Sequence, residues 1–288
     1  MYPAYDTKVL LRPASLYSTA DLVGMWSLAY ADYFSDLQFD ERRLATHLAV
    51  HDIDLGRSVV IETEEKEFVG LSLLSMRGAR GWIGGFGINP KHRRQGHSAI
   101  LIRSQLAVAH GAGLGSVQLE VLMQNWAGKV YERAGFTPVR QLFVLRGRVE
   151  TAAAADGVEL VSPRQALQHI QQMRCGQIWP WQRELATVTK GLTPTTIGAM
   201  VTLADGSSGA LVCDRGDDNA VRILDIAGGP ASVAPLLAVV RQLYDDREAL
   251  LMNEPADSDL HPYLLQSGLK PIWIQREMVL HFDLAPEG

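Results

Sequence analysis

The chain has 288 residues, of which 47% are hydrophobic and 20% charged, an ordinary balance for a globular protein and a sufficient length for two domains. Its net charge of −5 gives no overall attraction to nucleic acid or to an anionic membrane, and no apolar run is long enough to cross a bilayer. The first residues lack the basic and apolar regions of a signal peptide, and the two cysteines, Cys175 and Cys213, lack metal-ligand spacing. We therefore expect a cytoplasmic protein with reduced thiols and no metal, nucleic-acid or membrane partner.

Strands and helices alternate through the first half of the chain. Residues 9–13 predict a strand that ends at proline, and Ser18 is a suitable N-cap for a helix that runs toward Tyr30. The elements expected after it are a helix over 39–51, strands over 58–62, 68–76 and 82–88, a helix from residue 98, a strand over 117–122, a helix through residue 131 and a strand over 142–148. This pattern alone indicates a mixed α and β fold.

A basic turn that contains glycine joins the strand over 82–88 to the following helix. It reads Arg93-Arg94-Gln95-Gly96-His97-Ser98. Free amides at a helix N-terminus attract anions, and the two arginines add formal positive charge. Gly96 lets the backbone approach a ligand where a Cβ atom would collide. The turn therefore predicts a phosphate site, the alternative being a basic loop that only caps a surface helix.

A second motif follows, in which the strand over 117–122 leads through Asn125 to Tyr131 and Gly135-Phe136. Together the two motifs resemble the GCN5-related N-acetyltransferase (GNAT) family, which has a Gln/Arg-x-x-Gly-x-Gly/Ala turn and then an Asn…Ala…Tyr-x-x-x-Gly-Phe segment. The chain departs from this pattern twice: Ser98 replaces Gly or Ala, and Asn125 lies six residues before Tyr131 where the family usually has seven. The resemblance implies an α/β (α+β) fold, with a mixed, mostly antiparallel sheet flanked by helices.

The second half of the chain repeats the first in weaker form. Gly268-Leu269-Lys270-Pro271 matches Gly135-Phe136-Thr137-Pro138, and an apolar strand follows each. Toward the N-terminus from this motif, residues 249–252 correspond to the strand over 117–122, and residues 232–244 correspond to the helix from residue 98. Residues 221–229 correspond to the strand over 82–88. The turn from Gly228 to Ser232 has no basic residue and includes Pro230, which lacks an N–H group. We therefore expect two tandem modules, a catalytic one over 1–150 and a degenerate one over 151–288, with the linker at 150–156.

The resemblance implies an N-acetyltransferase that transfers an acetyl group from acetyl-CoA to a primary amine by direct attack in a ternary complex. We expect the acceptor to be a small molecule. A peptide or protein N-acetyltransferase and a non-catalytic acyl-CoA sensor are the alternatives. A free sheet edge in the second module would also allow two copies of the chain to pair, which leaves a homodimer open.

The cofactor residues follow from the same resemblance. The backbone of Phe86, Gly87 and Ile88 would bind the pantetheine arm as an added strand, and the Ile88 amide would polarise the thioester carbonyl. The Asn125 side chain would contact the same arm, the alternative being that its shifted spacing passes this contact to Gln124. The pyrophosphate would bind at Arg93, Arg94, Gln95, Gly96, His97 and Ser98.

Tyr131 matches the family's tyrosine that protonates the leaving thiolate, the alternative being an aromatic packed on the inner face of a helix. Because the strand over 82–88 has no carboxylate, Glu120 on the next strand is the best candidate for the general base. A glutamate that faces solvent is the alternative for Glu120. We expect Tyr30, Tyr33 and Trp126 to line the acceptor pocket, although each is equally consistent with core packing.

Overall fold

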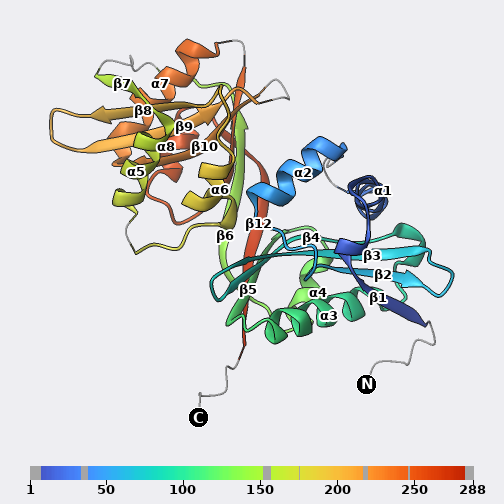
Figure 1. Cartoon of the computed structure of the whole chain (residues 1–288). Helices are drawn as coiled ribbons and strands as arrows, with labels where there is room; N and C mark the ends of the chain where they lie inside the picture. The colour runs from blue at the N-terminus through green and yellow to red at the C-terminus, as the bar shows by residue number, and fades with distance from the viewer. Residues whose placement is uncertain are drawn as a thin grey trace. The chain divides into compact units, whose positions relative to one another are not determined.

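The computed structural model describes residues 8–33, 38–151, 157–174, 176–216, 220–245 and 247–282. The chain divides into two compact units, the first comprising Met1–Val139 with Met278–Gly288 and the second Arg140–Glu277. Each unit has helices on both faces of a mixed, mostly antiparallel sheet, which confirms the predicted fold class (Figure 1). Most of the expected linker, at residues 152–156, and Cys175 lie outside the described residues.

The first unit contains the strand order β1-β2-β3-β4-β5, with the end of β12 next to β5. β4 and β5 are parallel, whereas β1, β2, β3 and β4 pair antiparallel. Its elements are β1 (Val9–Pro13), η1 (Ala14–Leu16), α1 (Thr19–Ala29), α2 (Glu41–Val50), β2 (Val59–Thr63), β3 (Phe68–Arg77), β4 (Arg80–Ile88), η2 (Pro90–His92), α3 (His97–Gly111), β5 (Ser116–Leu122) and α4 (Ala127–Arg133).

Hydrophobic residues are buried on both faces of the sheet in the first unit. On one face α1 and α2 pack Leu22, Trp26 and Leu44 against β3, while α3 and α4 pack Ile102 and Tyr131 on the other (Figure 1). α1 starts where predicted, because Ser18 and Asp21 form a capping box with each other's backbone. The sheet therefore separates the helices that precede β4 from those that follow it.

The second unit has the same layers in the strand order β12-β6-β11-β10-β9-β8-β7. α5 and α6 pack on one face of its sheet, and α7 and α8 on the other. Its elements are β6 (Thr137–Gly147), β7 (Val158–Val161), α5 (Pro163–Met173), η3 (Trp181–Arg183), α6 (Leu185–Lys190), β8 (Ile197–Thr202), β9 (Ser208–Asp214), β10 (Ala220–Gly228), η4 (Pro230–Ser232), α7 (Val233–Leu243), β11 (Glu248–Pro255), α8 (His261–Gln266) and β12 (Lys270–His281).

Two long strands are divided between the units. Residues 142–147 of β6 pair antiparallel with β11 in the second unit. In the first unit, Met278 of β12 belongs to the core under α3 and α4, and the Phe282 amide donates to the Gly115 carbonyl at 2.9 Å. The sequence suggested a division after residue 150. The compact units instead divide at residues 139 and 277, because each contains a strand segment from the other half of the chain.

Candidate active site

The parallel strands β4 and β5 of the first unit pair over only part of their length. Pairing runs from Arg80 opposite Ser116 to Trp82 opposite Gln118, although β4 continues to Ile88 and β5 to Leu122. We call the facing, mutually unpaired edges of residues 83–88 and 119–122 the strand gap. An extended ligand could hydrogen-bond to the free edge of β4 in the manner of an added strand.

A β-bulge at Gly84 marks the inner end of the strand gap. β3 pairs Leu74 with Ile83 and Leu73 with Gly85, so Gly84 is the extra residue on β4. A Cβ at Gly85 would lie 2.6 Å from the Trp26 ring, and one at Gly87 would lie 2.7 Å from the Ala29 Cβ. The glycines therefore let α1 lie directly on β4.

The backbone of β4 beyond the bulge already has partners in the chain. The Phe86 amide donates to the Tyr30 hydroxyl at 2.9 Å, and the Ile88 carbonyl accepts from the Arg93 Nε at 3.0 Å. Both groups therefore point away from β3 and toward the strand gap, on the edge where the pantetheine arm was predicted. Gly87 lies between these two residues, so its backbone N–H and C=O point to the opposite edge of β4, toward β3.

The predicted phosphate turn forms the N-terminus of the 15-residue helix α3. Gly96 is its N-cap, with φ +83°, and Arg94 has φ +62°. Within the described ranges, the amides of residues 95–98 donate to no backbone carbonyl. Arg94 is exposed and forms no ion pair with any described residue, so its guanidinium could reach an anion.

Other side chains of the turn bind the protein itself. The Arg93 guanidinium donates to the Ile88 and Ala29 carbonyls and pairs with Asp32 at 3.3 Å, so it connects the end of α1 to the end of β4. The Gln95 side chain donates to the Lys91 carbonyl at 3.2 Å. His97 is buried, and this burial lowers the pKa of its imidazole. Ser98 lies in the first turn of α3, half-buried.

Three tyrosines gather around Phe86. Tyr131 is 5% exposed, and its ring meets the Phe86 ring edge-on at 5.4 Å between centroids. Tyr30 and Tyr33 also make edge contact, at 5.2 Å. Burial raises the pKa of all three phenols, so each is a neutral hydrogen-bond donor at physiological pH.

The remaining predicted residues divide between the gap and the surface. Asn125, two residues before α4, accepts from the Ala127 amide at 2.9 Å, and its side chain also hydrogen-bonds to Tyr33. Trp126 is 76% exposed, and the Lys129 ammonium lies over its ring, 4.1 Å from the ring centroid. Glu120 accepts from the Trp82 indole N–H at 2.8 Å. The structure thus brings Tyr30, Tyr33, Asn125 and Tyr131 together, whereas Trp126 lies on the surface.

Two histidines that the sequence analysis did not identify, His47 of α2 and His51 directly after it, also lie near the bulge. The His47 ring is 4.5 Å from the His51 ring, and His51 stacks on Trp82 at 5.3 Å. The His47 imidazole lies close to the backbone of Gly84, and its buried Nε2 has no hydrogen-bond partner among the described residues. Their four-residue spacing on a predicted amphipathic helix was the available signal, because it places both side chains on one face.

These histidines should make the protein sensitive to acid. Burial lowers the pKa of His47 to about 3 and that of His51 to about 4, whereas an unfolded histidine titrates near 6.5. Below about pH 6.5 the unfolded chain therefore binds more protons than the folded one. Each histidine should then lower the free energy of unfolding by up to about 1.4 kcal/mol per pH unit, down to its folded pKa.

Urea unfolding of the wild type and of His47→Gln at pH 7, 6 and 5 tests this expectation. We expect a shallower loss of stability with acid in the variant, whatever its stability at pH 7. His281→Gln, at an exposed position, serves as the control and should keep the wild-type slope. Equal slopes in all three proteins would contradict the assignment.

The second unit repeats the geometry of the strand gap. β10 and β11 pair in parallel only as far as Ile223 and Leu251, and Leu224 is the extra residue in the register with β9. Ile226 thus lies two residues beyond its bulge, as Phe86 does in the first unit. The two positions are structural counterparts.

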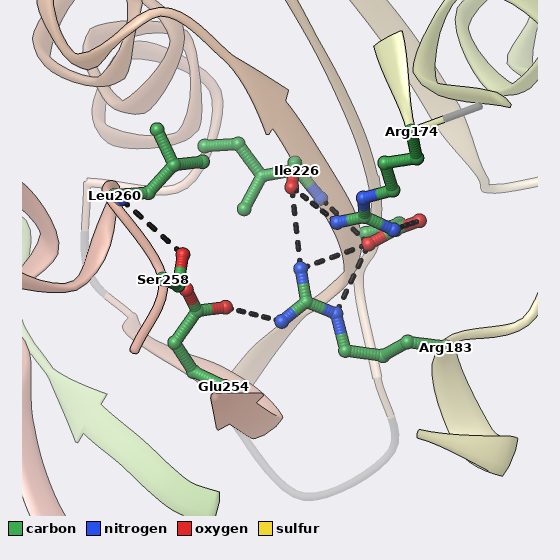
Figure 2. Close-up of polar contacts among 7 residues, drawn as sticks. Arg174, Arg183, Ile226, Glu254, Ser258 and Leu260 are labelled. Atoms are coloured by element: carbon green, nitrogen blue, oxygen red, sulfur yellow. Dashed lines mark hydrogen bonds and ion pairs between the residues drawn. The ribbon is translucent and has the colours of Figure 1, made fainter. Parts of the chain in front are cut away.

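A buried ion network occupies this second position. Arg174 and Arg183 both donate to the Ile226 carbonyl, at 2.7 and 3.2 Å, so their guanidinium groups converge on one backbone oxygen (Figure 2). Asp225 pairs with Arg174 at 2.5 Å and with Arg183 at 2.9 Å, and it accepts from the Ile226 amide at 3.0 Å. Glu254 of β11 pairs with Arg183 across the position where the strands diverge.

This network leaves no free backbone group on β10 at that point. Both the N–H and the C=O of Ile226 have partners inside the unit, and all four charged side chains are at most 8% exposed. The turn before α7 also lacks a basic residue, so it adds no positive charge to the helix N-terminus. The Phe86 N–H and C=O of the first unit are bonded to one neutral hydroxyl and not to a buried ion network. The first unit is also the one whose strand gap leads to a basic helix N-terminus.

Among the described residues, no three His, Cys, Asp or Glu side chains are close enough to hold a metal ion. No helix in the described ranges combines the length and the apolar character that crossing a bilayer requires.

Known proteins share the fold of this chain, and one family model matches its first half. Residues 21–136 match the model of the acetyltransferase (GNAT) family. A search of curated proteins finds no significant match. Solved structures of the same fold include a GCN5-related N-acetyltransferase from Sphaerobacter thermophilus, with TM-score 0.71, 14% identity and 99% of both chains covered. A tandem GNAT protein from the clavulanic acid biosynthesis pathway has TM-score 0.67 and 10% identity, covering 97% of this chain and 100% of that one.

Proposed function

Because residues 21–136 form a domain of the acetyltransferase (GNAT) family, we propose that this chain is an acetyl-CoA-dependent N-acetyltransferase with one active site, in its first unit. The acceptor is a primary amine on a small molecule, and it attacks the thioester directly while both substrates are bound. One observation carries the proposal: the strand gap leads directly into the basic N-terminus of α3. This arrangement suits a ligand with a phosphate at one end and an amide-bearing arm.

Acetyl-CoA fits both parts of this arrangement. Its pyrophosphate would accept from the amides of residues 95–98, with Arg94 supplying formal positive charge. Its pantetheine arm would run along β4 from the turn toward the bulge, with its amides facing the edge of Ile88 and Phe86. The thioester then lies at the inner end of the strand gap, beside Phe86 and Tyr131.

The reaction needs a proton donor and a proton acceptor. The Tyr131 phenol is neutral and buried beside Phe86, so it would protonate the departing thiolate. Glu120, held by the Trp82 indole N–H, would accept the amine proton through a water molecule. The Trp26 ring stacks on Tyr30 and makes a tilted contact with Phe39, and this closely packed aromatic cluster favours a small acceptor over an extended polypeptide.

Calorimetric titration with acetyl-CoA tests the cofactor site. We expect saturable binding at one site per chain in the wild type and no measurable binding in a Gly96→Asp, Arg94→Ala variant. The new carboxylate would stand at the helix N-terminus, where it repels phosphate, and the nearby guanidinium would be gone. Gly113→Asp is the matched control, because Gly113 has a similar φ of +77° at the other end of α3 and open space around its Cβ.

The control variant should bind as the wild type does. Loss of binding in both variants would indicate strain and not charge, and absence of binding in the wild type would overturn the proposal. Where the wild type binds, a panel of small amines assayed for thiol release tests catalysis. Binding without release for any amine or peptide would favour an acyl-CoA sensor.

A further inference from the structure

The Tyr30 hydroxyl lies at the point in the strand gap where the thioester is expected. It accepts from the Phe86 amide at 2.9 Å and donates to the Phe86 carbonyl at 3.3 Å. The first of these bonds is well formed, and the second is long for a hydroxyl donor. The Tyr30 hydroxyl therefore donates only a weak hydrogen bond, whereas its oxygen is held firmly by the strand amide.

Ring packing fixes the position of this hydroxyl. The Tyr30 ring stacks on Trp26 with centroids 4.3 Å apart and planes 26° apart, and Tyr33 contacts it edge-on. Trp26 is itself 3% exposed and is seated on Gly85 of the bulge. Moving the hydroxyl out of the gap would require the stack to open, so we expect Tyr30 to stay in place when a ligand binds.

We propose that Tyr30 is a second catalytic tyrosine, which donates a hydrogen bond to the thioester oxygen and stabilises the negative charge that develops there. This role rests on the proposed acetyl transfer. A hydroxyl that already accepts a backbone N–H is a stronger donor, and exchanging its long bond to Phe86 for one to an oxyanion is favourable. The Phe86 amide thus acts on the oxyanion through Tyr30.

The steps balance without any further reactant. The amine nitrogen forms a bond to the carbonyl carbon, and the C=O electron pair moves to the oxygen, where Tyr30 donates a hydrogen bond but transfers no proton. When the C=O bond re-forms, the C–S bond breaks and the thiolate takes the proton of Tyr131. The nitrogen loses its proton to Glu120 through the water molecule, Glu120 releases that proton to solvent, and solvent returns one proton to the Tyr131 phenolate. The products are therefore an amide and a free thiol.

Infrared spectroscopy of bound acetyl-CoA, ¹³C-labelled at the thioester carbonyl, tests this role without an acceptor. In the full-length wild type we expect the carbonyl stretch at a lower wavenumber than in Tyr30→Phe, because the donated hydrogen bond weakens the C=O bond. By calorimetry, the Kd for acetyl-CoA should differ by no more than about tenfold, the amount that one hydrogen bond supplies. CoA itself, which lacks the carbonyl, should bind both proteins equally and so report that the variant is folded.

Tyr17→Phe is the matched control. This phenol lies in the same unit but bonds to Glu62, away from the strand gap, and its loss should leave the carbonyl stretch unchanged. The same wavenumber in wild type and Tyr30→Phe, with tighter acetyl-CoA binding in the variant, would overturn the inference. Tyr30 would then only occupy the Phe86 amide and compete with the ligand for it. Failure of the wild type to bind acetyl-CoA would instead overturn the proposed function.

Discussion

Replacing Tyr131 by phenylalanine is expected to lower kcat by about 10²–10⁴-fold while leaving the Kd for acetyl-CoA nearly unchanged. The ring contacts with Phe86 and Phe136 do not involve the hydroxyl and should keep the substituted ring in place. Only the transferable proton is lost. Because the proton moves as the C–S bond breaks, its loss should affect the transition state and not the bound ground state.

The raised pKa of Tyr131 is compatible with this role. Burial is its main cause, and the neighbouring phenols Tyr30 and Tyr33 add to it. A thiolate that forms in the same dry site is destabilised by the same desolvation, so its affinity for a proton rises as well. The donor and the acceptor of the proton therefore shift in the same direction, and transfer between them stays feasible.

Tyr263→Phe is the matched control for Tyr131→Phe. Tyr263 lies on α8, the counterpart of α4 in the second unit, and is 41% exposed. Initial rates of thiol release with the best amine of the panel, measured beside calorimetric Kd values, separate the two effects. Unchanged kcat in Tyr131→Phe, or an equal loss in both variants, would remove Tyr131 from the chemistry.

Glu254→Gln is expected to destabilise the second unit by about 3–5 kcal/mol, the amount typical when one partner of a buried ion pair is removed. Glu254 is fully buried and bonds to Arg183, whose guanidinium is also buried. The glutamine keeps the shape but removes the charge. Arg183 would then share the single carboxylate of Asp225 with Arg174, which leaves one positive charge uncompensated in the interior.

Denaturant unfolding of the full chain measures this effect, as the decrease in the free energy of unfolding of the second unit. The control is Glu248→Gln on the same strand, because Glu248 pairs with Arg146 at 2.7 Å but both side chains are about one-third to one-half exposed. We expect that variant to lose less than about 1 kcal/mol. Similar losses in the two variants would show that burial does not amplify the charge effect.

The sequence alone was sufficient for the elements that carry local signals. Gly96 and its basic neighbours indicated the turn at the start of α3, and the repeat of Gly135 at Gly268 indicated two modules. The bulge at Gly84 was not predictable, because the alternation of residues does not show where one extra residue enters a ladder. The sequence also could not predict the ion-pair partners of Arg183. Asp225 and Glu254 lie far from it along the chain and become its neighbours only through sheet pairing.

The placement of side chains around the strand gap was predictable only in part. Tyr30 was expected in the acceptor pocket, yet its hydroxyl bonds to the strand amide, which no periodicity encodes. Arg93 was expected at the phosphate, and its guanidinium instead bonds to two carbonyls and to Asp32. Such contacts depend on where α1 ends relative to β4, and this is set by tertiary packing on Gly87.

The end of β12 makes the first unit dependent on the last residues of the described chain. Met278 fills its core and Phe282 bonds to its backbone, so the unit lacks a strand until these residues have been synthesised. On the ribosome, the first unit therefore cannot finish folding before residues 278–282 have emerged. A premature stop between residues 140 and 277 would therefore leave the first unit without part of its core, so each half of the chain depends on the other to fold.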